Sequence, residues 1–139
     1  MAKKTKPISK LKKELDKWFS LYIRLRDAMP VSGLIKCFTC PIAKNYKDGM
    51  QCGHFMSRRY MATRYHELNQ NQCIKCNMFE QGMQYVYGLN LDAKYGEGTA
   101  DELQQLARTT LKMSRIDYEE KIIYYKAIVK NLKEEKGIE

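Results

Sequence analysis

Two Cys-x-x-Cys pairs constrain this chain more than any other feature. Cys37 and Cys40 form the first pair, Cys73 and Cys76 form the second, and 32 residues lie between the pairs. Each pair can form a tight knuckle with both sulfurs directed at one point, so the four thiolates can bind one tetrahedral Zn²⁺. A redox pair would lie at the strand-to-helix turn of a thioredoxin-like unit, which this spacing does not match. We therefore expect a structural zinc site with no position open for water.

The composition fits one globular domain. The chain has 139 residues, of which 44% are hydrophobic and 29% charged, enough for one modest core but not for two. The fifth cysteine, Cys52, stands alone, and we expect a small buried side chain rather than a ligand. No apolar run is long enough to span a membrane, and the lysine-rich start does not resemble a secretory leader. We expect a cytoplasmic protein with reduced thiols and no membrane partner.

Positive charge is concentrated at the front of the chain. The formal net charge is +9, and residues 1–26 hold nine Lys and Arg against two acidic residues, a net charge of +7. Residues 101–139 carry eight of each. A basic segment ahead of a neutral one predicts a surface that binds a polyanion, of which nucleic acid is the usual one. The alternative is that the first lysines only form a solvated tail.

Periodicity predicts a long helix at each end of the chain. Apolar residues recur every three or four positions over residues 11–29, and Pro30 ends the pattern. The same spacing recurs over residues 118–132, with Ser114 as the expected N-cap and Gly137 as the stop. The two apolar seams either pack on each other within one chain or build a homodimer.

Between these helices the sequence predicts a small metal module. Residues 34–36 are expected to form a short strand that leads to the first cysteine pair, and Asp48-Gly49 is expected to be a hairpin turn. The further expectations are a returning strand over 51–55, an irregular stretch over 57–72, a helix over 77–87 and a loop over 88–98. A capping box from Thr99 to Glu102 predicts a further helix that continues to Leu111.

The whole chain, residues 1–139, is therefore expected to be one domain. It would comprise a basic N-terminal helix (1–29), a zinc-stapled core (34–87) and a C-terminal helical region (99–137). The predicted class is α+β and mostly α.

Three polar residues in the module could share one site. His54 lies at the end of the expected returning strand, while Asn77 and Glu80 project from one side of the helix start after the second cysteine pair. A hairpin clamped by zinc onto that helix would bring the three together. An oxygen-ligated Mg²⁺ or Mn²⁺ beside a histidine base is what phosphodiester hydrolysis needs, because the base activates water and the metal neutralises charge. The second histidine, His66, is expected to be an ordinary surface residue.

Basic side chains surround these positions. Such residues clamp phosphates beside a nuclease site, although they can equally well only solvate a loop. The predicted DNA-binding residues are Arg58, Arg59, Arg64 and Lys75.

The blocks around these residues resemble the phage lambda NinG/Rap recombination family. The likeness rests on Cys37-Phe-Thr-Cys40, Gln51-Cys-Gly-His54-Phe-Met-Ser-Arg-Arg59, Ala62-Thr-Arg64, Gln72-Cys-Ile-Lys-Cys-Asn77 and Gly82. It extends weakly upstream over residues 22–27 and downstream to the last helix, and so covers most of the chain. The module is also similar to the zinc-stapled resolvases of the phage endonuclease VII type, which have the same order of knuckle, His, Cys-Asn and Glu.

The resemblance implies a ββα-metal (His-Asn-His) endonuclease that cleaves branched DNA, such as a Holliday junction or a D-loop, in phage recombination. It places the protein in the host cytoplasm, with recombination proteins as further partners. By residue, it implies that His54 is the general base, Asn77 a ligand of the catalytic metal and Glu80 a catalytic carboxylate. Asn69 would orient the His54 ring through the backbone, with Asn71 as the alternative.

Two positions depart from these relatives. Gly53 stands where the endonuclease VII type has an acidic metal ligand, and Gln51 stands where lambda NinG has Asp. The second ligand of the catalytic metal is therefore left open between Glu80 and Glu67. The missing acid also keeps a second class of function open, a non-catalytic zinc DNA-binding protein that assists recombination. A general nicking nuclease is the third alternative.

Overall fold

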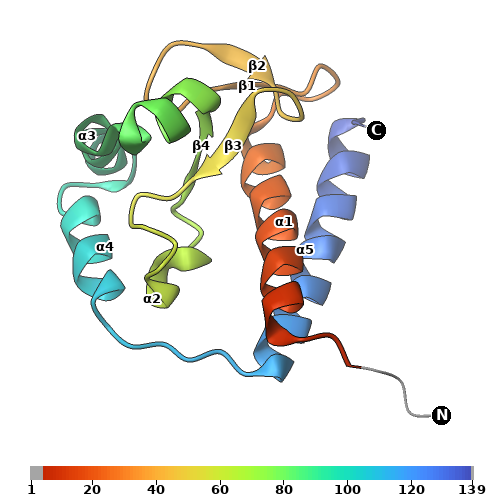
Figure 1. Ribbon diagram of the computed structural model, residues 1–139. Coiled ribbons are helices and arrows are strands. Elements are labelled where there is room, and N and C mark those ends of the chain that lie inside the picture. The colour runs from red at the N-terminus through yellow and green to blue at the C-terminus, as the bar shows by residue number, and fades with distance from the viewer. Residues whose placement is uncertain (1–4, 139) are drawn as a thin grey trace.

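The computed structural model describes residues 5–138 as a mostly helical α+β fold (Figure 1). Its helices are α1 (Ile8–Asp27), α2 (Met61–Arg64), the π-helical turn η1 (Lys75–Phe79), the 3₁₀ turn η2 (Gln81–Met83), α3 (Gln84–Tyr95), α4 (Thr99–Ala107) and α5 (Arg115–Lys136). Its strands are β1 (Leu34–Lys36), β2 (Ala43–Asn45), β3 (Met50–Gly53) and β4 (Gln70–Cys73). None of the described helices is long and apolar enough to cross a membrane.

Helices α1 and α5 lie side by side (Figure 1), so the two predicted seams pack on each other within the chain. The buried residues that they share are Leu11, Leu15, Phe19 and Ile23 of α1, and Tyr118, Ile122 and Tyr125 of α5. At the far end, Lys136 Nζ donates hydrogen bonds at 2.7–2.8 Å to the carbonyls of Leu25 and Arg26 in the last turn of α1 and of Ala28, the residue that caps it. The Leu25 carbonyl also accepts from the Ala28 N–H at 3.3 Å, and the lysine adds a C-terminal cap over these carbonyls at the end of the helix.

The strand pairing differs from the expected hairpin. A turn does occur at Asp48-Gly49, where Gly49 has φ +82°, but the strands on either side of it do not pair with each other. Instead β1 pairs with β2, and β3 pairs antiparallel with β4, with Gln51 opposite Gln72. Residues 57–72, expected to be irregular, contain α2 and most of β4. The sequence concealed β4 because three of its four buried residues are polar, which is not a typical strand composition.

The helix after the second cysteine pair is also different from the prediction. It is broken at Gly82 (φ +79°) and Met83 (φ +49°), and α3 then continues to Tyr95. The expected loop over 88–98 is therefore wrong for most of its length. Tyr87 and Leu91 are fully buried in a cluster with Phe55 and Leu103, and this packing overrides the weak helix propensity of glycine at position 88.

The two C-terminal helices begin in different ways. The capping box predicted at Thr99 is absent: Thr99 is already helical, and its hydroxyl donates to the Gly96 carbonyl at 2.7 Å. Helix α4 ends at Ala107, four residues before the predicted end. By contrast, Ser114 and Asp117 form a reciprocal capping box at the start of α5, and Gly137 ends that helix with φ +64°. Both of these predictions are confirmed.

Candidate functional site

The four cysteines of the two knuckles lie together. Their Sγ atoms are all within 4.8 Å of one another, with 3.6 Å between those of Cys40 and Cys73. Four sulfurs around a tetrahedral zinc, each about 2.3 Å from the ion, would lie about 3.8 Å apart. The donor set therefore fits a metal ion such as zinc. The site joins the end of β1 to the end of β4.

The polypeptide around the knuckles is arranged to hold thiolates. The backbone N–H of Cys73 donates to Cys37 Sγ at 3.3 Å, and the Thr39 hydroxyl lies 3.5 Å from the same sulfur. Burial raises the pKa of Cys37, but these hydrogen bonds outweigh it and lower the pKa to about 7. The fifth cysteine, Cys52, is buried apart from the cluster, and burial raises its pKa to about 12. It is a small core residue, as expected.

His54 follows β3 directly, and its ring is fixed by one hydrogen bond. Nε2 lies 2.9 Å from the main-chain carbonyl of Arg64. Since a carbonyl only accepts, Nε2 carries the hydrogen and Nδ1 keeps its lone pair. In the part of the chain that the structure describes, Nδ1 has no hydrogen-bond partner. Burial, together with the nearby charges of Arg58 and Arg64, outweighs the opposing effect of the hydrogen bond to the Arg64 backbone and lowers the pKa of His54 to about 4. The imidazole is therefore neutral at physiological pH and can accept a proton at Nδ1.

Asn69 binds the same stretch of backbone. Its Nδ2 donates to the carbonyls of Thr63 (3.1 Å) and Arg64 (3.3 Å), and the side chain is buried. His54 and Asn69 thus both donate a hydrogen bond to the carbonyl of Arg64. Asn71, the alternative, instead donates to the Lys36 carbonyl at 2.6 Å, beside the first knuckle.

The side chain of Asn77 contacts a glutamine of β3, not an acidic residue. Its Nδ2 donates to Gln51 Oε1 at 2.8 Å, which leaves Asn77 Oδ1 as an oxygen ligand. Glu80 lines a groove of about 330 Å³ beside Cys40 and Cys76, and neither His54 nor Asn77 lines that groove. Among the described residues, the four cysteines are the one group of three or more His, Cys, Asp or Glu side chains close enough to share a metal ion.

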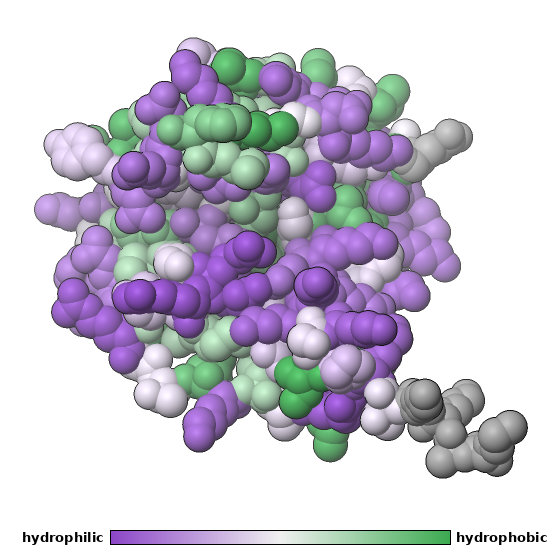
Figure 2. Space-filling view, viewed as in Figure 1, coloured by the Kyte–Doolittle hydropathy of each residue, from purple (hydrophilic) through white to green (hydrophobic). Residues whose placement is uncertain are grey.

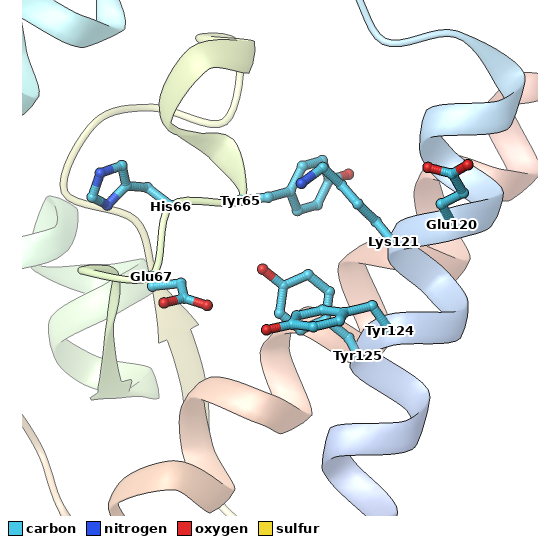
Figure 3. A pocket seen from close by; sticks show the side chains of 7 residues that line it. All are labelled: Tyr65, His66, Glu67, Glu120, Lys121, Tyr124 and Tyr125. Carbon is cyan, nitrogen blue, oxygen red and sulfur yellow. The ribbon is translucent and has the colours of Figure 1, made fainter.

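Glu67, the other candidate acid, faces a different hollow. This open groove of about 660 Å³ lies between α5 and the segment after α2 (Figure 3). In Figure 3 the Glu67 carboxylate and the hydroxyls of Tyr124 and Tyr125 point toward one another, while the His66 ring points away. Two carboxylates and one lysine line this groove, contributed by Glu67, Glu120 and Lys121. That lining repels phosphate, so the groove is a poor place for a DNA backbone.

Arg64, one of the predicted DNA-binding residues, is turned inward and held by a carboxylate, an arrangement that does not favour contact with DNA. The residue is 9% exposed, and its guanidinium forms a bidentate ion pair with Asp16 of α1, at 3.0 and 2.6 Å. Its third nitrogen donates to the Arg58 carbonyl at 2.8 Å. Apart from the presence of an acid in a basic segment, no local pattern indicates this pair, because its partners are 48 residues apart. Asp16 is thus a residue that sequence reasoning missed.

The other three predicted DNA-binding residues are on the surface. Arg58, Arg59 and Lys75 are exposed, and the side chain of Arg58 is 61% accessible. Hydrophilic side chains cover most of the face seen in Figure 2, with hydrophobic ones gathered mainly in its upper part. Exposed apolar side chains include Met78 and Phe79, which directly follow Asn77.

Comparison with known proteins identifies the family. The model of the family described as bacteriophage lambda NinG protein matches residues 1–135. No curated protein and no solved structure matches the chain. The match spans both cysteine knuckles, the His54 segment and nearly all of α5. The chain belongs to the bacteriophage lambda NinG family.

Proposed function

We propose that this protein is a metal-dependent DNA endonuclease of the ββα-metal (His-Asn-His) type, which cleaves branched DNA such as a Holliday junction or a D-loop during phage recombination. The observation that carries the proposal is the fixed imidazole of His54, with Nε2–H bound to the Arg64 carbonyl and the Nδ1 lone pair left to accept a proton. Asn69 steadies the same carbonyl. Hydrolysis of a phosphodiester needs such a base to take a proton from the attacking water.

The local architecture supports the same assignment. An antiparallel strand pair, β3 and β4, is followed by a helical segment that begins at the second knuckle and carries Asn77. The zinc would staple this unit, so that the positions of His54 and Asn77 are set by the fold and not by a mobile loop.

A second metal ion, Mg²⁺ or Mn²⁺, would be held by Asn77 Oδ1 together with oxygens of the scissile phosphate. When bound, it would neutralise charge on that phosphate and on the leaving oxygen. The chain supplies little negative charge there, because positions 51 and 53 are Gln and Gly. Mg²⁺ is usually held by one or two carboxylates plus phosphates, so its affinity should be low until DNA binds.

DNA would be held by the exposed basic side chains of Arg58, Arg59 and Lys75. Arg58 and Arg59 follow His54 within five residues, so phosphates bound to them would pass close to the base, and Lys75 begins η1 two residues before Asn77. Symmetric cleavage of a four-way junction requires two active sites, and we propose that a homodimer supplies them. Other recombination proteins would be further partners.

A second function is favoured by one observation, the absence of a carboxylate at positions 51 and 53. A zinc protein that binds branched DNA without cutting it would need neither His54 nor a catalytic metal. A general nicking nuclease would instead retain the chemistry but not the preference for branches.

One assay separates these functions. The wild-type protein is incubated with labelled four-way junction, D-loop and linear duplex, each with Mg²⁺ or with chelator after zinc loading. We expect Mg²⁺-dependent cleavage of the branched substrates, which His54→Ala lowers by about 10²–10⁴-fold, the usual contribution of a general base. His66→Ala is the matched control and should cut normally. Binding without cleavage by any variant would support the accessory function, and equal cleavage of the linear duplex would support the general nuclease. A mass of one chain on the junction in light scattering would contradict the dimer.

A further inference from the structure

The carbonyl that orients His54 belongs to a residue that the N-terminal helix holds in place. Arg64 is the last residue of α2, which has only four residues and is too short to be stable by itself. Its carbonyl accepts from His54 Nε2 at 2.9 Å and from Asn69 Nδ2 at 3.3 Å. Any displacement of residue 64 would therefore move the ring of His54.

The side chain of the same residue is clamped to α1. Both carboxylate oxygens of Asp16 accept from the Arg64 guanidinium, at 3.0 and 2.6 Å, in the two-pronged geometry that fixes distance and angle together. Tyr65, the next residue, donates its hydroxyl to Asp16 Oδ1 at 2.7 Å. The third guanidinium nitrogen of Arg64 donates to the Arg58 carbonyl at 2.8 Å and so links the two ends of residues 58–64. One carboxylate on α1 thus holds two consecutive residues of the segment.

Ring packing ties the same helix to the imidazole. The Phe19 ring, one turn along α1 from Asp16, lies 6.4 Å from the His54 ring and 5.6 Å from the Tyr65 ring, between centroids. Helix α1 is itself packed along α5, and Phe19 is buried between them. The imidazole is therefore linked to α1 in two ways, directly by packing near the Phe19 ring and indirectly through Arg64, whose side chain Asp16 holds.

We infer that Asp16 is a positioning residue, which acts through Arg64 to hold the His54 ring with Nδ1 directed away from the segment that anchors Nε2. This inference rests on the proposed function for its catalytic meaning, but the arrangement of the ring can be measured without any activity. It assigns the long N-terminal helix a part in the site beyond its basic charge.

The experiment reads the imidazole directly. The chain has two histidines, so the ¹⁵N NMR spectrum of the imidazoles of the zinc-loaded protein contains two sets of signals, which His66→Gln assigns. In the wild type we expect His54 as a single Nε2–H tautomer. In Asp16→Asn, which keeps the shape but loses the charge, we expect a shift or doubling of the His54 signals. The His66 ring is an internal reference, because its Nδ1 accepts from the Leu68 N–H, a contact that does not involve α1.

Kinetics on the junction gives the second measurement. Asp16→Asn should lower kcat by up to about 10²-fold, the loss that a displacement of about 1 Å produces, with little change in KM. Glu14→Gln is the matched control, since it removes one negative charge from the same helix at a surface pair with Lys6. It should change neither the NMR signals nor kcat. If Asp16→Asn does not fold, Arg64→Lys takes its place, because lysine keeps the charge but lacks the two-pronged contact.

The outcomes separate the two ideas. Wild-type His54 signals in Asp16→Asn, or in Arg64→Lys where the first variant does not fold, would overturn the positioning role. Displaced His54 signals in Asp16→Asn, together with a wild type that cuts no substrate, would support the positioning role and contradict the proposed nuclease. A lower kcat with unaltered His54 signals would mean that Asp16 acts on the reaction by another route, which also overturns the inference.

Discussion

Gly53 and Gln72 approach each other so closely across the β3–β4 pair that position 53 has no room for a side chain. A Cβ built on Gly53 would overlap Gln72 Oε1 and lie 2.7 Å from its Cγ. Gln72 is itself fully buried and donates to Thr39 Oγ1 and to the Gly82 carbonyl, at 3.0 and 2.8 Å. An acidic residue before His54 would therefore clash with Gln72, which is held by the residues around the zinc knuckle. Restoring the acid would require changes at these other positions as well.

Gly53→Ala should therefore destabilise the protein by about 1–3 kcal/mol, the usual cost of overpacking. Truncating the opposing side chain should relieve the overlap, so Gly53→Ala should cost less in a Gln72→Ala background than in the wild type. Urea unfolding of the two single variants and the double variant measures this coupling energy. Strictly additive effects would mean that the two positions do not constrain each other.

The cysteine cluster leads to a prediction about metal content. Cys73→Ser leaves three thiolates and should lower both the zinc content and the free energy of unfolding, the latter by several kcal/mol, because binding and folding are coupled. Cys52→Ala is the matched control, since that cysteine is buried outside the cluster. It should keep one Zn²⁺ per chain. Elemental analysis and thermal melts with and without chelator decide the matter, and a metal-free wild type with an unchanged melting curve would contradict the site.

The features that the sequence predicted are those encoded by local spacing. The knuckles at Cys37 and Cys73, the seam of α5 and the Ser114 cap each depend on residues a few positions apart, so each could be found from the chain alone. Strand β4 could not, because its burial depends on distant partners: the Gln70 N–H donates to the Tyr87 hydroxyl, and Asn71 donates to the Lys36 carbonyl. Polar residues satisfied in this way have the same sequence pattern as an exposed loop.

The candidate site likewise has residues that could be predicted from the sequence and contacts that could not. His54 and Asn77 were predicted from residue type and order, and Asn69 from the family resemblance, but only the fold shows that His54 and Asn69 share the Arg64 carbonyl. An arginine near a nuclease motif has the same sequence signature whether it binds phosphate or a buried carboxylate. The difference for Arg64 lies in Asp16, which no local pattern connects with it.

The low pKa of His54 predicts a specific acid sensitivity. The ring is protonated near pH 4 in the folded state and near 6.5 when unfolded, so between these values the unfolded state binds more protons. Stability should therefore be complete above about pH 6.5 and fall as the pH drops toward 4, by at most about 3 kcal/mol from this residue.

His54→Gln removes that titration while other groups, the zinc thiolates included, titrate in both proteins. The free energy of unfolding of the wild type should then fall more steeply between pH 7 and pH 5 than that of the variant. The measurement is urea unfolding at several pH values with zinc present. Parallel pH profiles would show that the ring is as easily protonated in the fold as in the unfolded chain.

The arginines around His54 should separate into two classes. Arg58 and Arg59 are exposed, so replacing both with Ala should change stability by no more than about 0.5 kcal/mol per site. It should weaken binding to every DNA alike and flatten the plot of log affinity against log salt by up to about 2, because each lost phosphate contact changes the slope by about 0.9. The 3.9 Å contact between Arg58 and Asp16 is largely exposed and adds little to stability.

Arg64→Ala should behave in the opposite way, because it leaves Asp16 without its main partner. We expect a loss of about 3 kcal/mol in the free energy of unfolding, typical of breaking a buried pair from one side. Below the midpoint of unfolding, the salt slope of DNA binding should match that of the wild type, since the guanidinium is turned inward. Fluorescence anisotropy over a potassium chloride series and urea unfolding on the same preparations test both arms. An Arg64→Ala protein of normal stability with a flattened salt slope would place this arginine on the DNA after all, and would remove the physical basis for the clamp on α1.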